Sequence, residues 1–204
     1  MLEQVLTEHR TALHRQPHPE VSAVKPIETD AELMARHLSG DDDAFIELFN
    51  RLNHKLYLFS LKILRSPNAA EDIVQEVWEK VILLRRSGQM IQNPGGFCMR
   101  IVRNLCLNAF RRQKKFLPLT ANIEEMGIFQ NPMKEADEMS EHVLSSLDTL
   151  SFEHREILVL QAYCGYHLDE IAGMIGISKE AVWKRASRAR KKLRTRVLES
   201  MSDN

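Results

Sequence analysis

The feature that most constrains the fold of this chain is a stripe of large apolar residues recurring at steps of three and four between residues 45 and 63. This spacing places all of its members on one face of an α-helix, and a face of that width must be buried against other elements. Glycine and proline are sparse along the chain, which favours helix over strand throughout. We therefore predict an all-α protein. The stripe consists of Phe45, Leu48, Phe49, Leu52, Leu56, Phe59 and Ile63.

Three further helices are predicted around this one, and together they form a first small helical domain over residues 29–115. One helix begins at Asp30 and ends at the cap residue Gly40. Another follows Ser66-Pro67, with Asn68 expected as its N-cap. The last begins at Asn93-Pro94, a cap followed by the residue best suited to the first helical turn, and runs to about residue 115.

The remaining divisions of the chain follow from where this periodicity stops. Residues 1–28 carry three prolines and little apolar pattern, so we expect a mobile N-terminal extension. Residues 116–138 are also aperiodic and are interrupted by Pro118, Gly127 and Pro132, which predicts a flexible linker. A second small domain is expected over residues 139–198, followed by a tail at 199–204.

The second domain has the pattern of a helix-turn-helix. Ser140 and Ser151 are plausible N-caps for its first two helices. A short helix over residues 168–175, a turn at Gly176 and a long helix capped by Ser178 complete the motif. In such a motif the start of the second helix enters the major groove of DNA. This interpretation selects a set of side chains on the outer face of the last helix: Lys179, Trp183, Lys184, Ser187, Arg188, Lys191 and Lys192. For Trp183 two interpretations stay open, contact with DNA and cover of the edge of the domain.

Charge is strongly segregated, although the formal net charge is zero. Residues 179–196 hold nine basic residues against one acid, a local net of +8, which suits a DNA-binding surface. Residues 120–156 hold nine acids against two basic residues, a local net of −7, and are expected to avoid phosphate.

Other classes of protein are disfavoured. No apolar run is long enough to cross a bilayer and no signal peptide is visible, so we expect a cytoplasmic protein without membrane insertion. The three cysteines include no CxxC pair and are expected to be reduced core residues. Asp41, Asp42 and Asp43 are expected to cap a helix rather than to bind a metal, and we predict no cofactor. No nucleophile-base pair or phosphate-binding glycine loop is visible, so no enzyme is expected.

Several fragments, in this order and spacing, resemble the extracytoplasmic-function sigma factors of bacterial RNA polymerase, a compact group of the sigma-70 family with two helical regions called region 2 and region 4. In region 2 they are Gly40-Asp41, Ala44-Phe45, Leu48-Phe49, Ala70-Glu71-Asp72-Ile73-Val74-Gln75-Glu76-Val77-Trp78 and Phe97-Cys98-Met99-Arg100-Ile101-Val102-Arg103-Asn104. In region 4 they are Asp169-Glu170-Ile171-Ala172, Ile175-Gly176-Ile177-Ser178 and Arg185-Ala186-Ser187-Arg188-Ala189-Arg190.

The resemblance implies a role for each region. The chain is expected to bind core RNA polymerase, to direct it to promoters, and to be held by an anti-sigma factor, the usual regulator in this group. Asp72, Gln75, Glu76 and Glu79 are implied to dock on the clamp helices of the largest polymerase subunit, and the flap region is a further implied contact. The helix that follows is implied to read the -10 element, with Asn104 at an unpaired base. The side chains assigned to this element are Arg100, Arg103, Asn104, Asn108, Arg111 and Arg112, and the last helix is implied to read the -35 element.

The sequence departs from the family at positions that bear on base preference. Phe97, Met99 and Asn108 stand where the family often has Trp, Tyr and Asp. His167 replaces the usual Ser or Thr cap before the helix-turn-helix, which weakens that cap unless the imidazole substitutes.

One alternative function stays open from the residues alone. An ordinary helix-turn-helix regulator could use residues 30–115 as an effector domain that senses a ligand. The polar face of the helix after Asn93, with its arginines and asparagines, makes this alternative less favourable.

Overall fold

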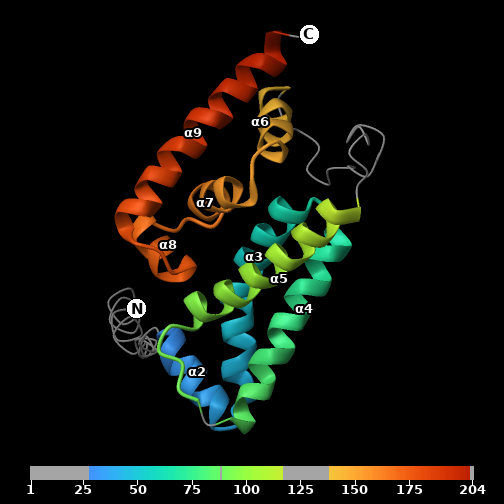
Figure 1. Ribbon diagram of the computed structural model, residues 1–204. Coiled ribbons are helices and arrows are strands. Elements are labelled where there is room, and N and C mark those ends of the chain that lie inside the picture. Colours follow the sequence, from blue (N-terminus) through green and yellow to red (C-terminus); the bar gives the residue numbers. More distant parts are fainter. Residues whose placement is uncertain (1–27, 88, 117–137, 203–204) are drawn as a thin grey trace, which may run out of the picture.

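A computed structural model describes residues 28–87, 89–116 and 138–202 of the chain (Figure 1). The described part consists of helices and contains no strand, which confirms the all-α prediction. The expected mobile extension and most of the expected linker lie outside the described residues. The helices are α2 (Asp30–Leu38), α3 (Asp42–Leu64), α4 (Pro67–Leu83), the short 3-10 helix η1 (Leu84–Arg86), α5 (Pro94–Phe116), α6 (Glu138–Asp148), α7 (Phe152–Ala162), α8 (Leu168–Ile175) and α9 (Lys179–Ser202).

The acidic run before α3 caps that helix, as predicted. The side chain of Asp41 accepts hydrogen bonds from the backbone N–H groups of Asp43 and Ala44 at 3.0 and 3.1 Å. It thereby satisfies donors that the first helical turn leaves without partners. Among the described residues, no group of three or more His, Cys, Asp or Glu side chains is arranged to hold a metal ion.

Two predicted caps are wrong, both because the helix begins earlier than expected. The N-cap of α4 is Ser66, whose hydroxyl accepts from the N–H of Ala69 at 3.3 Å, and not Asn68. Pro67 then occupies the first turn, where its missing N–H costs nothing and its fixed φ suits the helix. Ser140 lies inside α6, which already begins at Glu138.

The apolar stripe on α3 forms the centre of residues 28–116. Leu48, Leu56, Phe59 and Ile63 are almost completely buried, and α3 contacts α2, α4 and α5. The indole N–H of Trp78 on α4 donates to the side chain of Asn53 on α3 at 2.9 Å, which satisfies the polar group of a buried aromatic residue. The stripe prediction is therefore confirmed.

The helix-turn-helix over residues 168–202 also has the predicted geometry. Gly176 adopts a left-handed conformation with φ of 73° between α8 and α9, a region where a side chain is strained. Ser178 caps α9 by accepting from the N–H of Ala181 at 3.2 Å. Before α8, the carboxylate of Glu170 accepts from the N–H of His167 at 2.7 Å. Helix α9 extends to Ser202, into the segment expected as a tail.

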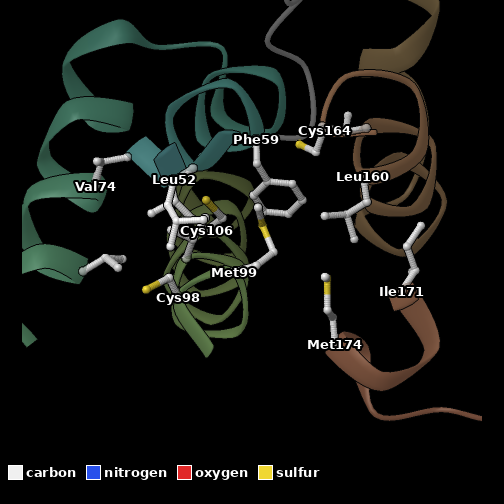
Figure 2. Packing of buried hydrophobic residues seen from close by; sticks show 14 of the residues in the cluster. Leu52, Phe59, Val74, Cys98, Met99, Cys106, Leu160, Cys164, Ile171 and Met174 are labelled. Carbon is white, nitrogen blue, oxygen red and sulfur yellow. The ribbon is translucent and has the colours of Figure 1, made fainter. Parts of the chain in front are cut away.

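The two halves of the chain pack against each other and share one hydrophobic cluster. Helix α7 contacts α3, and α8 contacts α5. Figure 2 shows Phe59 and Met99 of the first half facing Leu160 of the second, with Ile171 and Met174 beside it. The sequence indicated two small domains but did not indicate that they bury their surfaces against one another.

All three cysteines are buried and free, as predicted. Burial raises the pKa of Cys98, Cys106 and Cys164 to about 12 in each case, so the thiols stay protonated at neutral pH. They are core residues rather than reactive groups.

Helix α3 offers a matched test of this packing. Leu48 is 0% exposed and Ile46, two residues earlier, is 54% exposed. We expect Leu48→Ala to lower the free energy of unfolding by about 2–5 kcal/mol, because the truncation leaves a cavity. Ile46→Ala should change it by no more than about 0.5 kcal/mol. Urea unfolding followed by circular dichroism measures both, and equal losses would contradict the assignment of the buried face.

Candidate nucleic-acid and protein-binding surfaces

Helix α9 presents a cationic outer face. Its inner residues Val182, Ala186 and Ala189 are completely buried against the rest of the helix-turn-helix. All seven side chains that the sequence assigned to DNA are exposed, including Trp183, which is 57% exposed. Lys179 forms an ion pair with Asp169 at 2.8 Å, and a pair as exposed as this one contributes little stability. The outer face therefore remains accessible to a partner.

A groove of about 490 Å³ lies beside this face, between α9 and the loop that joins α6 to α7. Arg188, Lys191, Lys192 and Arg196 line one side of it, and residues 149–151 line the other. Burial and the charge of Lys192 lower the pKa of His154 near the groove, which keeps its imidazole neutral. A concentration of cations around a groove is a surface that attracts phosphate.

The sequence interpretation missed part of this groove. Arg196 continues the helical spacing from Arg188 through Lys192, so this signal was present in the sequence. Thr149 and Ser151 join the groove only because α6 and α7 pack against α9, which no local pattern indicates.

Helix α5 carries a second polar face. Arg100, Asn104, Asn108, Arg111 and Arg112 are exposed on it. Arginine and asparagine side chains at helical spacing suit contacts to phosphates and to base edges. Five of the six side chains assigned to the -10 element are therefore accessible on one helix.

Arg103, the sixth of this set, is engaged elsewhere. Its side chain is 19% exposed and donates to both carboxylate oxygens of Glu156 on α7, from Nε at 2.6 Å and from a terminal nitrogen at 3.3 Å. Glu156 is 0% exposed, and Arg185 of α9 approaches the same carboxylate at 3.6 Å. Burial raises the pKa of Glu156 and the hydrogen bond from Arg103 opposes that shift.

Helix α4 presents a polar stripe opposite its buried side. Ile73, Val77 and Val81 are buried, as predicted. On the other side Asp72, Gln75 and Glu79 are exposed, and Glu76 is about half exposed and pairs with Lys80 at 2.5 Å. Gln75 donates to Glu79 at 3.0 Å. The stripe is acidic and suits a basic partner surface.

The described helices contain no segment that is both long and apolar enough to span a membrane.

Comparison with known proteins accounts for both halves of the chain. A family model for Sigma-70 region 2 matches residues 48–116, and one for Sigma-70, region 4 matches residues 146–195. The chain is 30% identical over 165 residues to the ECF RNA polymerase sigma factor SigM of Mycobacterium tuberculosis, which covers 81% of this chain and 83% of that protein. It is 31% identical over 166 residues to the RNA polymerase sigma factor CarQ of Myxococcus xanthus, and the match covers 79% of this chain and 93% of that protein.

Two solved structures share the fold. CnrH in complex with the cytosolic domain of CnrY matches with a TM-score of 0.65 and 23% identity, covering 85% of this chain and 99% of that one. The sigma factor RpoE in complex with the anti-sigma factor NepR from Bartonella quintana matches with a TM-score of 0.59 and 21% identity. This match covers 76% of this chain and 96% of that one.

Proposed function

Because the chain belongs to the extracytoplasmic-function sigma factors of the sigma-70 family, we propose that it binds core RNA polymerase through α4 and reads the -10 and -35 promoter elements with α5 and α9. The observation that carries this proposal is the presence of two separate polar helix faces, on α5 and α9, in one chain. An ordinary helix-turn-helix regulator needs only the second of them. If residues 30–115 were an effector domain that senses a ligand, the exposed arginines and asparagines on α5 would have no binding partner in the function.

The -10 element is assigned to α5. Asn104 is exposed, and its amide both donates and accepts, so it can recognise a base that has left the duplex. Arg100, Arg111 and Arg112 lie exposed along the same helix and are proposed to hold the phosphates without regard to sequence. Asn108 is proposed as a further contact.

The -35 element is assigned to the outer face of α9. Arg188 is proposed to read a guanine edge, because its planar guanidinium can donate two parallel hydrogen bonds. Lys184 is proposed to neutralise phosphate, as are the lysines beside the groove, Lys191 and Lys192. Lys179, Trp183 and Ser187 complete the proposed contact surface.

Two protein partners are proposed. The acidic stripe on α4 suits the clamp helices of the largest polymerase subunit, and region 4 is proposed to meet the flap region. An anti-sigma factor is the proposed regulator, which is supported by the similar fold of a sigma factor solved with the anti-sigma factor NepR. The chain is proposed to act in the cytoplasm, together with the polymerase.

Transcription in vitro tests the function directly. Core polymerase alone should start at scattered positions on genomic DNA, whereas core plus this protein should start at defined positions that share two upstream elements. Sequencing of the transcript 5′ ends measures this. Identical start positions with and without the protein would reject the proposal.

The core-binding assignment has a matched control on α3. We expect Asp72→Ala/Gln75→Ala/Glu76→Ala to weaken binding to core polymerase by about tenfold or more, because several polar contacts are lost together. The triple substitution Asp43→Ala/Glu47→Ala/Asn50→Ala removes the same number of acids and amides from another exposed helix face and should leave the affinity unchanged. A titration followed by fluorescence anisotropy measures both. Equal affinities of the two triple variants, with helix content intact, would refute the assignment.

Replacing Arg188 and replacing Lys184 should have different effects on binding to promoter variants: the first should change base preference and the second should lower affinity for every sequence. Arg188→Ala should cost about 1–3 kcal/mol at one base pair and flatten the preference there. Lys184→Ala should weaken binding to all sequences alike and reduce the salt slope by about one unit. Holoenzyme binding to a library of -35 variants at several salt concentrations measures both effects. Full retention of base preference in Arg188→Ala would mean that α9 docks differently.

A further inference from the structure

The interface between the two halves of the chain is built around one side chain that the proposed function also needs. Arg103, on the helix assigned to the -10 element, gives its guanidinium to Glu156, a completely buried carboxylate of region 4. The guanidinium also lies over the ring of Phe152, 5.8 Å from its centroid. A carboxylate and a phosphate offer an arginine the same pair of acceptor oxygens. Glu156 therefore holds the position at Arg103 that a promoter phosphate would take.

Further contacts close the same interface. Arg155 of α7 donates to the backbone oxygen of Ile63 at the end of α3, at 3.0 Å. Arg65, just after α3, forms an ion pair with Asp148 of α6 at 3.1 Å. Phe152 also packs against Phe110 of α5, with 5.6 Å between ring centroids. The ends of α3 and α5 are thus held to the start of region 4 by polar and aromatic contacts.

This closed arrangement is too compact for both promoter elements. Helix α8 contacts α5 on one side and α9 on the other, so a single helix of about 10–12 Å diameter lies between the two helices assigned to DNA. Elements named for positions -10 and -35 lie about 25 base pairs apart, or roughly 85 Å along a straight duplex at 3.4 Å per base pair. Simultaneous contact with both elements requires the two halves to separate.

We propose that the Arg103–Glu156 ion pair is a latch that holds the factor closed and keeps Arg103 from promoter DNA until the two regions separate. This inference rests on the proposed function, since it concerns the regulation of the same DNA-binding site. Opening transfers the guanidinium from the carboxylate to a phosphate. Arg185, which belongs to region 4 itself, stays beside Glu156 and supplies a positive charge to it in the open state. The exchange is therefore reversible without leaving a buried charge unpaired.

Energy transfer between two dyes on the full-length chain tests the latch. Exposed Asn68 on α4 and exposed Glu199 on α9 can each be replaced by cysteine for labelling, because the native thiols are buried and protonated. Glu156→Gln keeps the shape of the side chain and removes its charge. Arg103→Gln breaks the pair from region 2 and leaves region 4 intact. Both should raise the ratio of open to closed molecules by about tenfold or more, because each removes the charge attraction that joins Arg103 of the first half to Glu156 of the second.

The control is Glu153→Gln, an exposed glutamate one turn earlier on α7, which should leave transfer efficiency at the wild-type value. The double variant Arg103→Gln/Glu156→Gln should open no further than either single variant, since both remove one interaction. Adding core polymerase and promoter DNA should lower the wild-type efficiency to the value of the variants.

Wild-type efficiency in both single variants, with helix content unchanged, would overturn the latch. Opening that is strictly additive in the double variant would overturn it as well. The proposed function fails separately: variants that open while neither they nor the wild type directs specific initiation would leave the latch standing and remove the promoter assignment.

Discussion

The apolar stripe on α3 is the surface on which the rest of the molecule is assembled. Helices α2, α4 and α5 pack around α3, and α7 of the second half packs against it as well. Phe59 of α3 is completely buried, and Figure 2 shows it facing Leu160 of the second half. Because α4 and α5 turn their apolar faces toward α3, their polar faces are directed outward. The arrangement of the core thus determines which residues partners can reach.

The polar groups at the interface between the halves have a different role from the apolar core. Burial of Glu156 and Arg155 costs solvation, which ion pairs and hydrogen bonds recover only when the geometry is good. Arg155 meets this condition by donating to three backbone oxygens, those of Leu147, Asp148 and Ile63. Such contacts are satisfied in one relative placement of the two halves and lost in others. These polar contacts therefore favour one defined arrangement of the two halves over non-specific association of their apolar surfaces.

Most of the fold could be predicted from local pattern, because each helix has its own periodicity and stop signals. The positions of α8, Gly176 and Ser178 are examples, since turn and cap chemistry act within a few residues. The misplacement of the α4 cap at Asn68 arose where two cap residues compete within three positions, and the preference of Pro67 for the first turn decided between them.

The packing of the two halves had a weaker signal. From Phe152 to Leu160, α7 is buried on nearly all sides, and its charged residues Arg155 and Glu156 are no exception. A helix that is buried all round has partners on both faces. The sequence shows that a charged pair interrupts this apolar run but cannot show which arginine, 53 positions away, meets the glutamate. Long-range ion pairs depend on the placement of whole elements, so the family resemblance that implied Arg103 as a DNA contact did not indicate its partner in the fold.

The ion pair between Arg103 and Glu156 joins the acidic part of the chain to a cationic helix face. The sequence predicts only that the acidic stretch ending at Glu156 avoids phosphate, yet its last residue binds Arg103 of α5, the helix proposed to read the -10 element. Salt would act unequally on the two groups proposed to compete for Arg103, the buried carboxylate of Glu156 and an exposed DNA phosphate. Exposed contacts to phosphate are screened strongly, within a Debye length of about 8 Å at physiological ionic strength, whereas a buried pair is screened much less. If Arg103 binds a promoter phosphate as proposed, rising salt weakens that contact faster than it weakens the pair with Glu156. Under the proposed latch, and in the presence of DNA, rising ionic strength therefore shifts Arg103 from phosphate toward Glu156, even though the formal net charge of the chain is zero.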